Sequence, residues 1–272
     1  MVSFREYVDA DRAEPLRQGD VLEAVDANAS PWDRLLFVVT ADCDLAHRKH
    51  NGRVTCVPLL DQEEYLRIFA VPKVASKIET QLYDELTQLL TRSGAGGISL
   101  ERAREWVLEA ANDQIIEALR SDNTSGESEA KLLGAIRRIN QPVGRVEDFI
   151  ANALEAQSTV AHPPKPKNAR RRVTDSLREC YRNPPGDALF ISSVAPGRES
   201  GYFAYLRHIE QVMESDIATG PMRRQATHRR IARLSDRYAH ALVQRFALVF
   251  MPVGLPPEYE EMRDLYAESI GL

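Results

Sequence analysis

The chain has 272 residues, of which 43% are hydrophobic and 28% are charged. This length fits one large domain or two modest ones, and the composition excludes a wholly disordered chain. The longest apolar run, 246–253, is too short to cross a membrane, and no apolar signal region opens the sequence. Three cysteines in so long a chain indicate a reducing compartment. We therefore expect a cytoplasmic protein with no membrane partner.

The charges are distributed unevenly along the chain. Lys and Arg total 35 and Asp and Glu total 40, which gives a formal net charge of −5. Residues 162–172 nevertheless hold five cations and no acid, and residues 222–237 hold six arginines and one acid. Arginine suits phosphate because its guanidinium is bidentate and always charged. The candidates for binding an RNA backbone are Arg170, Arg171, Arg172, Arg230 and Arg233, with Arg223 and Arg224 beside them.

An interpretation in which the two basic runs have no binding function stays open. Such runs are most often solvated faces. The late arginines could also pair with acids near the end of the chain, such as Glu258, Glu260 and Glu261. Because Arg230 and Arg233 are three residues apart, a regular strand would point them to opposite faces, so that only one reaches a shared cleft.

The first part of the chain predicts strands. Residues 35–40 give the strongest strand signal and are apolar on both faces, which favours a central position in a sheet. Asn51 and Gly52 form a hairpin-type turn, because both tolerate positive φ. Residues 54–60 predict the returning strand, and Pro58 should close it because proline cannot donate to a ladder.

The middle of the chain predicts helices. Ile78, Leu82 and Leu86 follow an i, i+4, i+8 stripe, and Ser99 suits the N-cap of a further helix. The proline-rich stretch 162–167 predicts an extended arm, with first proteolytic cleavage expected near 165–172. Strand signals return at 188–192, at 202–206 and more weakly at 230–234, and Ser235 then begins a C-terminal helix.

Strand runs separated from helix runs predict an α+β fold. We expect residues 1–60 and 184–272 to form a small antiparallel β-barrel or curled sheet with a C-terminal helical cap. Residues 61–183 should be a long helical insertion.

Three features lie at the front of the predicted sheet: Gly19-Asp20 before the first strand, Arg34 before an apolar strand that ends in Thr40, and the segment 57–59, Val-Pro-Leu. In this order they resemble toxin ribonucleases of the MazF/PemK group over residues 17–60. The resemblance implies an SH3-like barrel in which Arg34 and Thr40 cleave RNA without a metal. The family's Arg-Pro pair is Arg34-Leu35 here, and the helical insertion is far longer than those compact toxins carry.

Residues 40–50 hold the densest cluster of reactive side chains. One interpretation is a zinc site made of Cys43, His47, His50 and Cys56, all competent ligands on a predicted hairpin. Another is a Cys43 nucleophile with His47 as its base, although the flanking carboxylates would raise the pKa of the thiol. In a third, Cys43 is a buried hydrophobe, the histidines are solvated and Asp44 caps the following turn.

No nucleotide-binding, serine-hydrolase or metalloprotease motif is present. The leading hypothesis is therefore a non-catalytic accessory or interaction component of a bacterial multi-component system. The resemblance implies phage defence or a toxin–antitoxin pair as its setting. Protein partners would dock on the insertion or on the acidic C-terminal helix. The alternatives are an RNA-binding protein or metal-independent endoribonuclease, and a zinc or thiol site centred on Cys43. No cofactor is expected apart from zinc in that last case.

Overall fold

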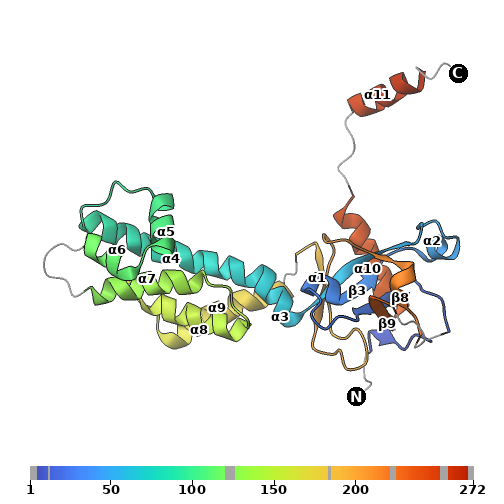
Figure 1. Ribbon diagram of the computed structural model, residues 1–272, viewed down its shortest axis with the longest axis horizontal. Coiled ribbons are helices and arrows are strands. Elements are labelled where there is room, and N and C mark those ends of the chain that lie inside the picture. Colours follow the sequence, from blue (N-terminus) through green and yellow to red (C-terminus); the bar gives the residue numbers. More distant parts are fainter. Residues whose placement is uncertain are drawn as a thin grey trace. The chain divides into compact units, whose positions relative to one another are not determined.

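The computed structural model describes residues 5–11, 13–119, 126–182, 185–220, 225–251 and 257–268. The chain divides into two compact units (Figure 1). We call residues 1–59 with 186–272 the sheet unit, and residues 60–185 the helical unit. No helix within the described ranges has both the length and the apolar character that a membrane span requires.

The sheet unit is built on one curled, mostly antiparallel half-barrel. In the described residues its strands follow the order β1-β9-β2-β3-β4-β6-β5, with β7 beside β4 and β8 parallel to β9. The predicted α+β class, with a curled sheet and a long helical insertion, is confirmed. The strands are β1 (Tyr7–Val8), β2 (Asp20–Ala24), β3 (Leu35–Val38), β4 (Arg53–Asp61), β5 (Ala188–Ile191), β6 (Tyr202–Tyr205), β7 (Glu210–Met213), β8 (Ile217–Ala218) and β9 (His228–Leu234).

Strand β3 is central, as its apolar sequence predicts. It pairs with β2 on one side and β4 on the other, and all four of its residues are buried. Leu36 and Val38 belong to one hydrophobic cluster, whereas Leu35 and Phe37 belong to a second on the opposite face. Both faces of the sheet are therefore covered, which explains why the strand has no polar alternation.

Helices cover and connect the strands of the sheet unit. Ala239 and Leu242 of α10 pack into the cluster that contains Phe37. Asp44 does not cap the turn after β3, which corrects our prediction. The helix begins at Asp42 after Ala41, so both carboxylates lie in its first turn, where the helix dipole favours them. The helices are α1 (Pro31–Arg34), α2 (Asp42–Ala46), the 3₁₀ turn η2 (Glu214–Asp216), α10 (Asp236–Val249) and α11 (Pro257–Glu268).

The helical unit starts at a capping box directly after β4. The Glu64 amide donates to the Asp61 carboxylate at 2.8 Å, and the Asp61 amide donates to the Glu64 carboxylate at 3.0 Å. The predicted stripe Ile78, Leu82 and Leu86 is buried in the core of this unit. Its helices are α3 (Gln62–Tyr65), the π-helical turn η1 (Leu66–Ala70), α4 (Val71–Arg92), α5 (Leu100–Glu109), α6 (Asn112–Leu119), α7 (Glu127–Ile139), α8 (Val146–Ser158) and α9 (Pro166–Arg182).

The basic arm is not extended over its whole length, which corrects a second prediction. Residues from Pro166 onward are helical and form α9, whose Ala169, Val173 and Leu177 are buried. Proline suits the first turn of a helix because its missing N–H needs no intrahelical partner. The expected proteolytic cleavage at 165–172 therefore loses its structural basis, since most of that segment is a packed helix.

Candidate functional site

Arg230 and Arg233 of β9 lie on the same side of the sheet, contrary to the simple three-residue spacing rule. Arg233 is opposite Asp20 and Arg230 is opposite Leu22, while the register shifts between these pairs. The shift is a β-bulge that leaves Ile231 without a partner on β2. One extra residue reverses the alternation, so both guanidinium groups approach the same Asp20 carboxylate.

These two arginines form a buried ion network with Asp20 and Glu14. Arg233 Nε donates to Asp20 Oδ1 at 2.7 Å, and Arg230 Nη1 donates to Asp20 Oδ2 at 3.2 Å. Arg233 Nη1 donates to Glu14 Oε2 at 2.6 Å. Burial alone would lower the pKa of Arg233, but its bonds to Asp20 and Glu14 outweigh burial and raise it. The network therefore favours the charged form of Arg233.

A short N-terminal strap, residues 13–17, lies beside this network. Arg230 donates to the strap carbonyl oxygens of Pro15 at 2.9 Å and Glu14 at 3.0 Å, and to that of Asp11 at 2.6 Å. The side chain of Arg230 is only 1% exposed. As the structure stands, neither Arg230 nor Arg233 is available to an RNA phosphate, and their partners are Asp20 and Glu14 rather than the C-terminal acids.

Arg34 and Thr40 lie at opposite ends of β3 and do not meet. Arg34 is the half-buried last residue of α1, and Thr40 follows the strand. Six residues of extended chain span up to about 20 Å. The Thr40 hydroxyl accepts the Thr55 amide at 2.7 Å, so it secures the turn of the β3–β4 hairpin. A joint catalytic role for Arg34 and Thr40 stays a prediction.

The structure does not bring Cys43 and Cys56 together as the predicted zinc site requires. Cys43 is exposed, whereas Cys56 is buried within the sheet core. Burial raises the pKa of the Cys56 thiol. Within the described residues, no three or more His, Cys, Asp or Glu side chains are placed to hold a metal ion. The idea that Cys43 packs as a buried hydrophobe is wrong, because α2 carries it on the surface.

His50 has a structural role that its sequence position did not suggest. Its side chain is buried, with Nδ1 3.0 Å from the Asp44 carbonyl oxygen and Nε2 2.9 Å from Glu214 Oε2. The Asp44 carbonyl and then the Glu214 carboxylate raise the pKa of His50. Both ring nitrogens are therefore engaged, while His47 is exposed on the same loop.

The earlier basic run lies on α9 of the helical unit. Arg170 pairs with Glu147 at 2.7 Å, and Arg171 lies 3.7 Å from Asp175. Arg172 is exposed and lines a surface hollow. Arg223 and Arg224, from the later basic run, lie outside the described residues.

Glu23 anchors a second charge cluster in the sheet unit. It accepts hydrogen bonds from Arg229, whose Nε lies 2.9 Å from Oε2, and from Arg198. Burial alone would raise the pKa of Glu23, but the two arginines outweigh it and hold the pKa below the ordinary value of 4.5. The ionised Glu23 therefore contributes its full stabilisation when the pH is above the ordinary pKa of 4.5. This stabilisation is lost as the pH falls through the lowered pKa of the folded protein.

We therefore expect Glu23→Gln to lower the melting temperature at neutral pH by an amount that shrinks as the pH is reduced. The difference should begin to narrow below about pH 4.5, because the Glu23 carboxylate of the unfolded chain then takes up a proton while that of the folded chain stays ionised to lower pH. Thermal melts of both proteins across this range test the prediction. Glu147→Gln, at an exposed ion pair, serves as the control. A difference for Glu23→Gln that stays constant down to acid unfolding would contradict the assigned pKa direction.

A groove lies between α4 and α9 of the helical unit. It consists of two adjoining hollows of about 420 and 630 Å³ that share Val74, Lys77 and Ser176. Figure 1 shows α4 running beside α7, α8 and α9, and these helices pack on one another. Apolar side chains that line the groove are Tyr65, Phe69, Ala70, Val74, Ile78, Val160 and Val173.

One end of this groove lies at the π-helical turn η1. Phe69 and Ala70 of that turn line the smaller hollow, and Phe69 packs against Tyr65 with ring centroids 5.0 Å apart. Single π-turns inside helices are frequent at functional sites. Lys73 and Lys77 follow on the next turns of α4, one helical turn apart and exposed. The sequence showed no groove here, because its second wall comes from α9, about 100 residues later in the chain.

Comparison with known proteins adds no identification. No family model matches the chain, and neither a curated protein nor a solved structure matches it. The resemblance of residues 17–60 to the MazF/PemK toxins thus stays an expectation. The features of the described residues that bear on function are the α4–α9 groove and the charge networks of the sheet unit.

Proposed function

We propose that this protein is a non-catalytic interaction component whose helical unit docks an acidic, amphipathic helical segment of a partner protein in the α4–α9 groove. The observation that carries the proposal is an apolar groove edged by two exposed lysines. When a helix binds in a groove, the apolar side chains that line the groove provide affinity, and the charges beside it set the orientation of the helix.

The lysines favour an acidic partner. Among the described residues, neither Lys73 nor Lys77 has a carboxylate within ion-pair distance, whereas Asp175 on the α9 side is already close to Arg171 and Arg178. A ligand carboxylate would therefore meet positive charge along the α4 edge, whereas Asp175 and Glu179 make the facing α9 edge of the same hollow acidic. Asp84 and Glu85 lie at the far end of the groove and would repel a ligand that is acidic along its whole length.

The groove is as long as a short helix. From Lys73 to Gln88 its α4 wall is about 22 Å long at 1.5 Å per residue. A partner helix of about 15 residues would match this length. Its apolar stripe would contact the half-buried Phe69 and the small exposed fractions of Val74 and Ile78. Glutamates toward one end of the partner helix would lie near the two lysines.

The non-catalytic part of the proposal is supported by how the reactive side chains are used. Thr40 bonds to backbone, His50 bonds through both ring nitrogens, and Arg230 and Arg233 are held by carboxylates. An SH3-like closure of the sheet, and a setting in bacterial phage defence or a toxin–antitoxin pair, remain part of this proposal because both rest on the resemblance.

The test is a double charge reversal, Lys73→Glu with Lys77→Glu, in the full chain. Binding is measured by fluorescence anisotropy with a labelled 15-residue peptide that carries a leucine stripe and glutamates at one end. We expect the reversal to weaken binding at least tenfold, because two attractive contacts become repulsive. Arg102→Glu with Lys131→Glu, both exposed and outside the groove, is the charge-matched control.

Two outcomes would refute the docking proposal. One is a wild-type protein that does not bind the peptide at high micromolar concentration. The other is equal weakening by the test and control variants, which would indicate general electrostatic attraction. Circular dichroism melts of all variants separate either result from loss of fold.

RNA binding is the second candidate, and the exposed cations at the start of α9 favour it. Lys165, Lys167, Arg171 and Arg172 are exposed there. If RNA binds, its affinity should fall steeply with salt, because each neutralised phosphate releases counterions. Filter binding of a short single-stranded RNA at increasing salt tests this, and Arg34→Ala and Thr40→Ala test for cleavage. No retention of RNA at low salt would exclude this candidate.

A further inference from the structure

The guanidinium of Arg233 has an unsatisfied donor in a buried position. Its Nε is bonded to Asp20 and its Nη1 to Glu14, but Nη2 is buried and has no acceptor among the described residues. The whole side chain is only 9% exposed. Buried polar groups are normally hydrogen-bonded, so this donor points to an acceptor that the described residues do not supply.

The two carboxylates of the network are not equivalent. Asp20 is fully buried and contacts both arginines, whereas the Glu14 side chain is 46% exposed and contacts Arg233 alone. Two cations and two anions make the network neutral as it stands. If the Glu14 carboxylate moves away, one net positive charge remains at a position that solvent reaches through Glu14.

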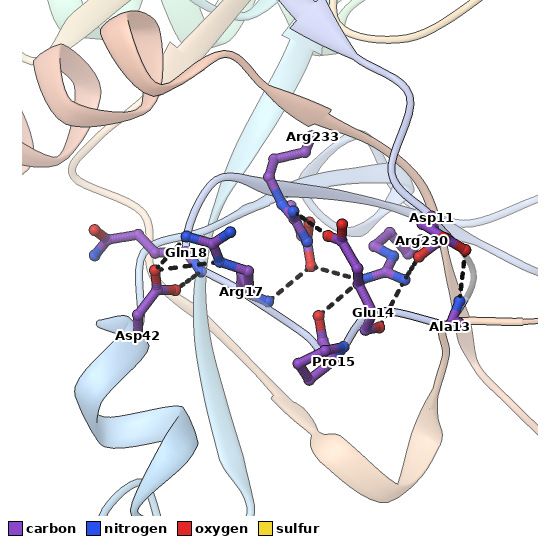
Figure 2. Close-up of polar contacts among 10 residues, drawn as sticks. Asp11, Ala13, Glu14, Pro15, Arg17, Gln18, Asp42, Arg230 and Arg233 are labelled. Atoms are coloured by element: carbon purple, nitrogen blue, oxygen red, sulfur yellow. Dashed lines mark hydrogen bonds and ion pairs between the residues drawn. The ribbon is translucent and has the colours of Figure 1, made fainter.

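The strap does not depend on the Glu14 carboxylate. Arg230 holds the strap through the carbonyl oxygens of Glu14 and Pro15 (Figure 2). Leu16 of the strap is buried in the sheet core. A change in the Glu14 side chain therefore leaves the backbone beside the arginines in place.

We propose that Arg233 is the centre of an anion site for the phosphoryl group of a small phosphate-bearing ligand, which binds by displacing the Glu14 carboxylate. Nη1 and Nη2 lie on one edge of the guanidinium, and this edge fits two oxygens of one anion. Glu14 uses only Nη1. A phosphoryl group would accept from both nitrogens and carries more negative charge than a carboxylate. This site lies in the sheet unit and does not rest on the docking groove.

The experiment measures binding of inorganic phosphate and of methyl phosphate by isothermal titration calorimetry in a chloride-free buffer. Glu14→Ala should bind both probes about tenfold more tightly than wild type, because the competing carboxylate is gone. Phosphate should also raise the melting temperature of Glu14→Ala more than equimolar acetate does. Glu147→Ala removes the partner of the exposed Arg170 and should show neither effect.

A further variant, Glu14→Ala with Arg233→Lys, keeps the positive charge but removes the paired guanidinium nitrogens. It should lose most of the phosphate affinity that Glu14→Ala gains over wild type. Should this variant fail to fold, the preference of Glu14→Ala for phosphate over acetate still tests whether the site selects the more highly charged phosphoryl group over a carboxylate. The proposal is overturned if wild type binds neither probe at tens of millimolar, or if phosphate stabilises Glu147→Ala as much as Glu14→Ala. A response to methyl phosphate but not to inorganic phosphate would show that the ligand is a phosphomonoester.

Discussion

Val38→Asp should unfold the sheet unit. Val38 is fully buried as the last residue of β3, opposite Cys56, and packs with Leu36 and Val54. An aspartate there must either stay charged without a partner or take up a proton, and both states lose the favourable burial of the valine. The expected destabilisation is about 3–5 kcal/mol, a large part of the stability of a typical domain.

Chemical denaturation followed by circular dichroism measures this effect, with expression in the soluble fraction as a second readout. Val25→Asp is the matched control, because Val25 is the same residue type and is 57% exposed just after β2. The control should change the free energy of unfolding by no more than about 0.5 kcal/mol. A soluble Val38→Asp protein with a normal unfolding transition would mean that β3 is not buried.

Asp20→Asn should be the second most damaging change. It leaves Arg230 and Arg233 buried with one exposed carboxylate between them, and removing one partner from a buried ion network costs about 3–5 kcal/mol. Asparagine keeps the shape of the side chain and an oxygen that can accept the Arg17 amide, which Asp20 Oδ2 accepts at 2.8 Å. The measured loss would therefore report charge rather than packing.

Urea denaturation of Asp20→Asn gives the free energy of unfolding, and Glu147→Ala provides the comparison. Glu147 and Arg170 are more than half exposed, and such a pair contributes about 0–1 kcal/mol. The double variant Asp20→Asn with Arg233→Met should recover part of the loss, because one of the uncompensated cations is removed. Equal effects of Asp20→Asn and Glu147→Ala would show that the network is open to solvent.

Local patterns predicted the elements that depend on local chemistry. The apolar run at 35–38 became the central strand, and Ile78, Leu82 and Leu86 became a buried helix stripe. Asn51 and Gly52 both have positive φ, as the hairpin turn requires. These features follow from the periodicity of side chains along a strand or helix and from residue-specific backbone preferences, so they are readable without knowing any distant contact.

Local patterns did not predict the short edge strands or the end of β4, because these depend on contacts between distant residues. Pro58 does not end β4, which continues to Asp61, because the buried Leu59 and Leu60 extend the strand through the core. Strand β1 has only two residues and exists because Tyr7 pairs with Leu234. Pairing of this kind depends on residues more than 200 positions away, and no local pattern reports it.

The sequence by itself determined that the chain is an α+β protein with strands at both ends and a helical insertion, because hydrophobic periodicity is a local property. Only the tertiary structure decided which charges face solvent. Arg230 and Arg233 belong to a run that reads as a basic surface, yet a bulge in β9 turns both toward Asp20, about 210 residues earlier in the chain. Burying a charge requires a partner of opposite sign in the folded molecule, and that partner is set by the pairing of distant strands rather than by neighbours in the sequence.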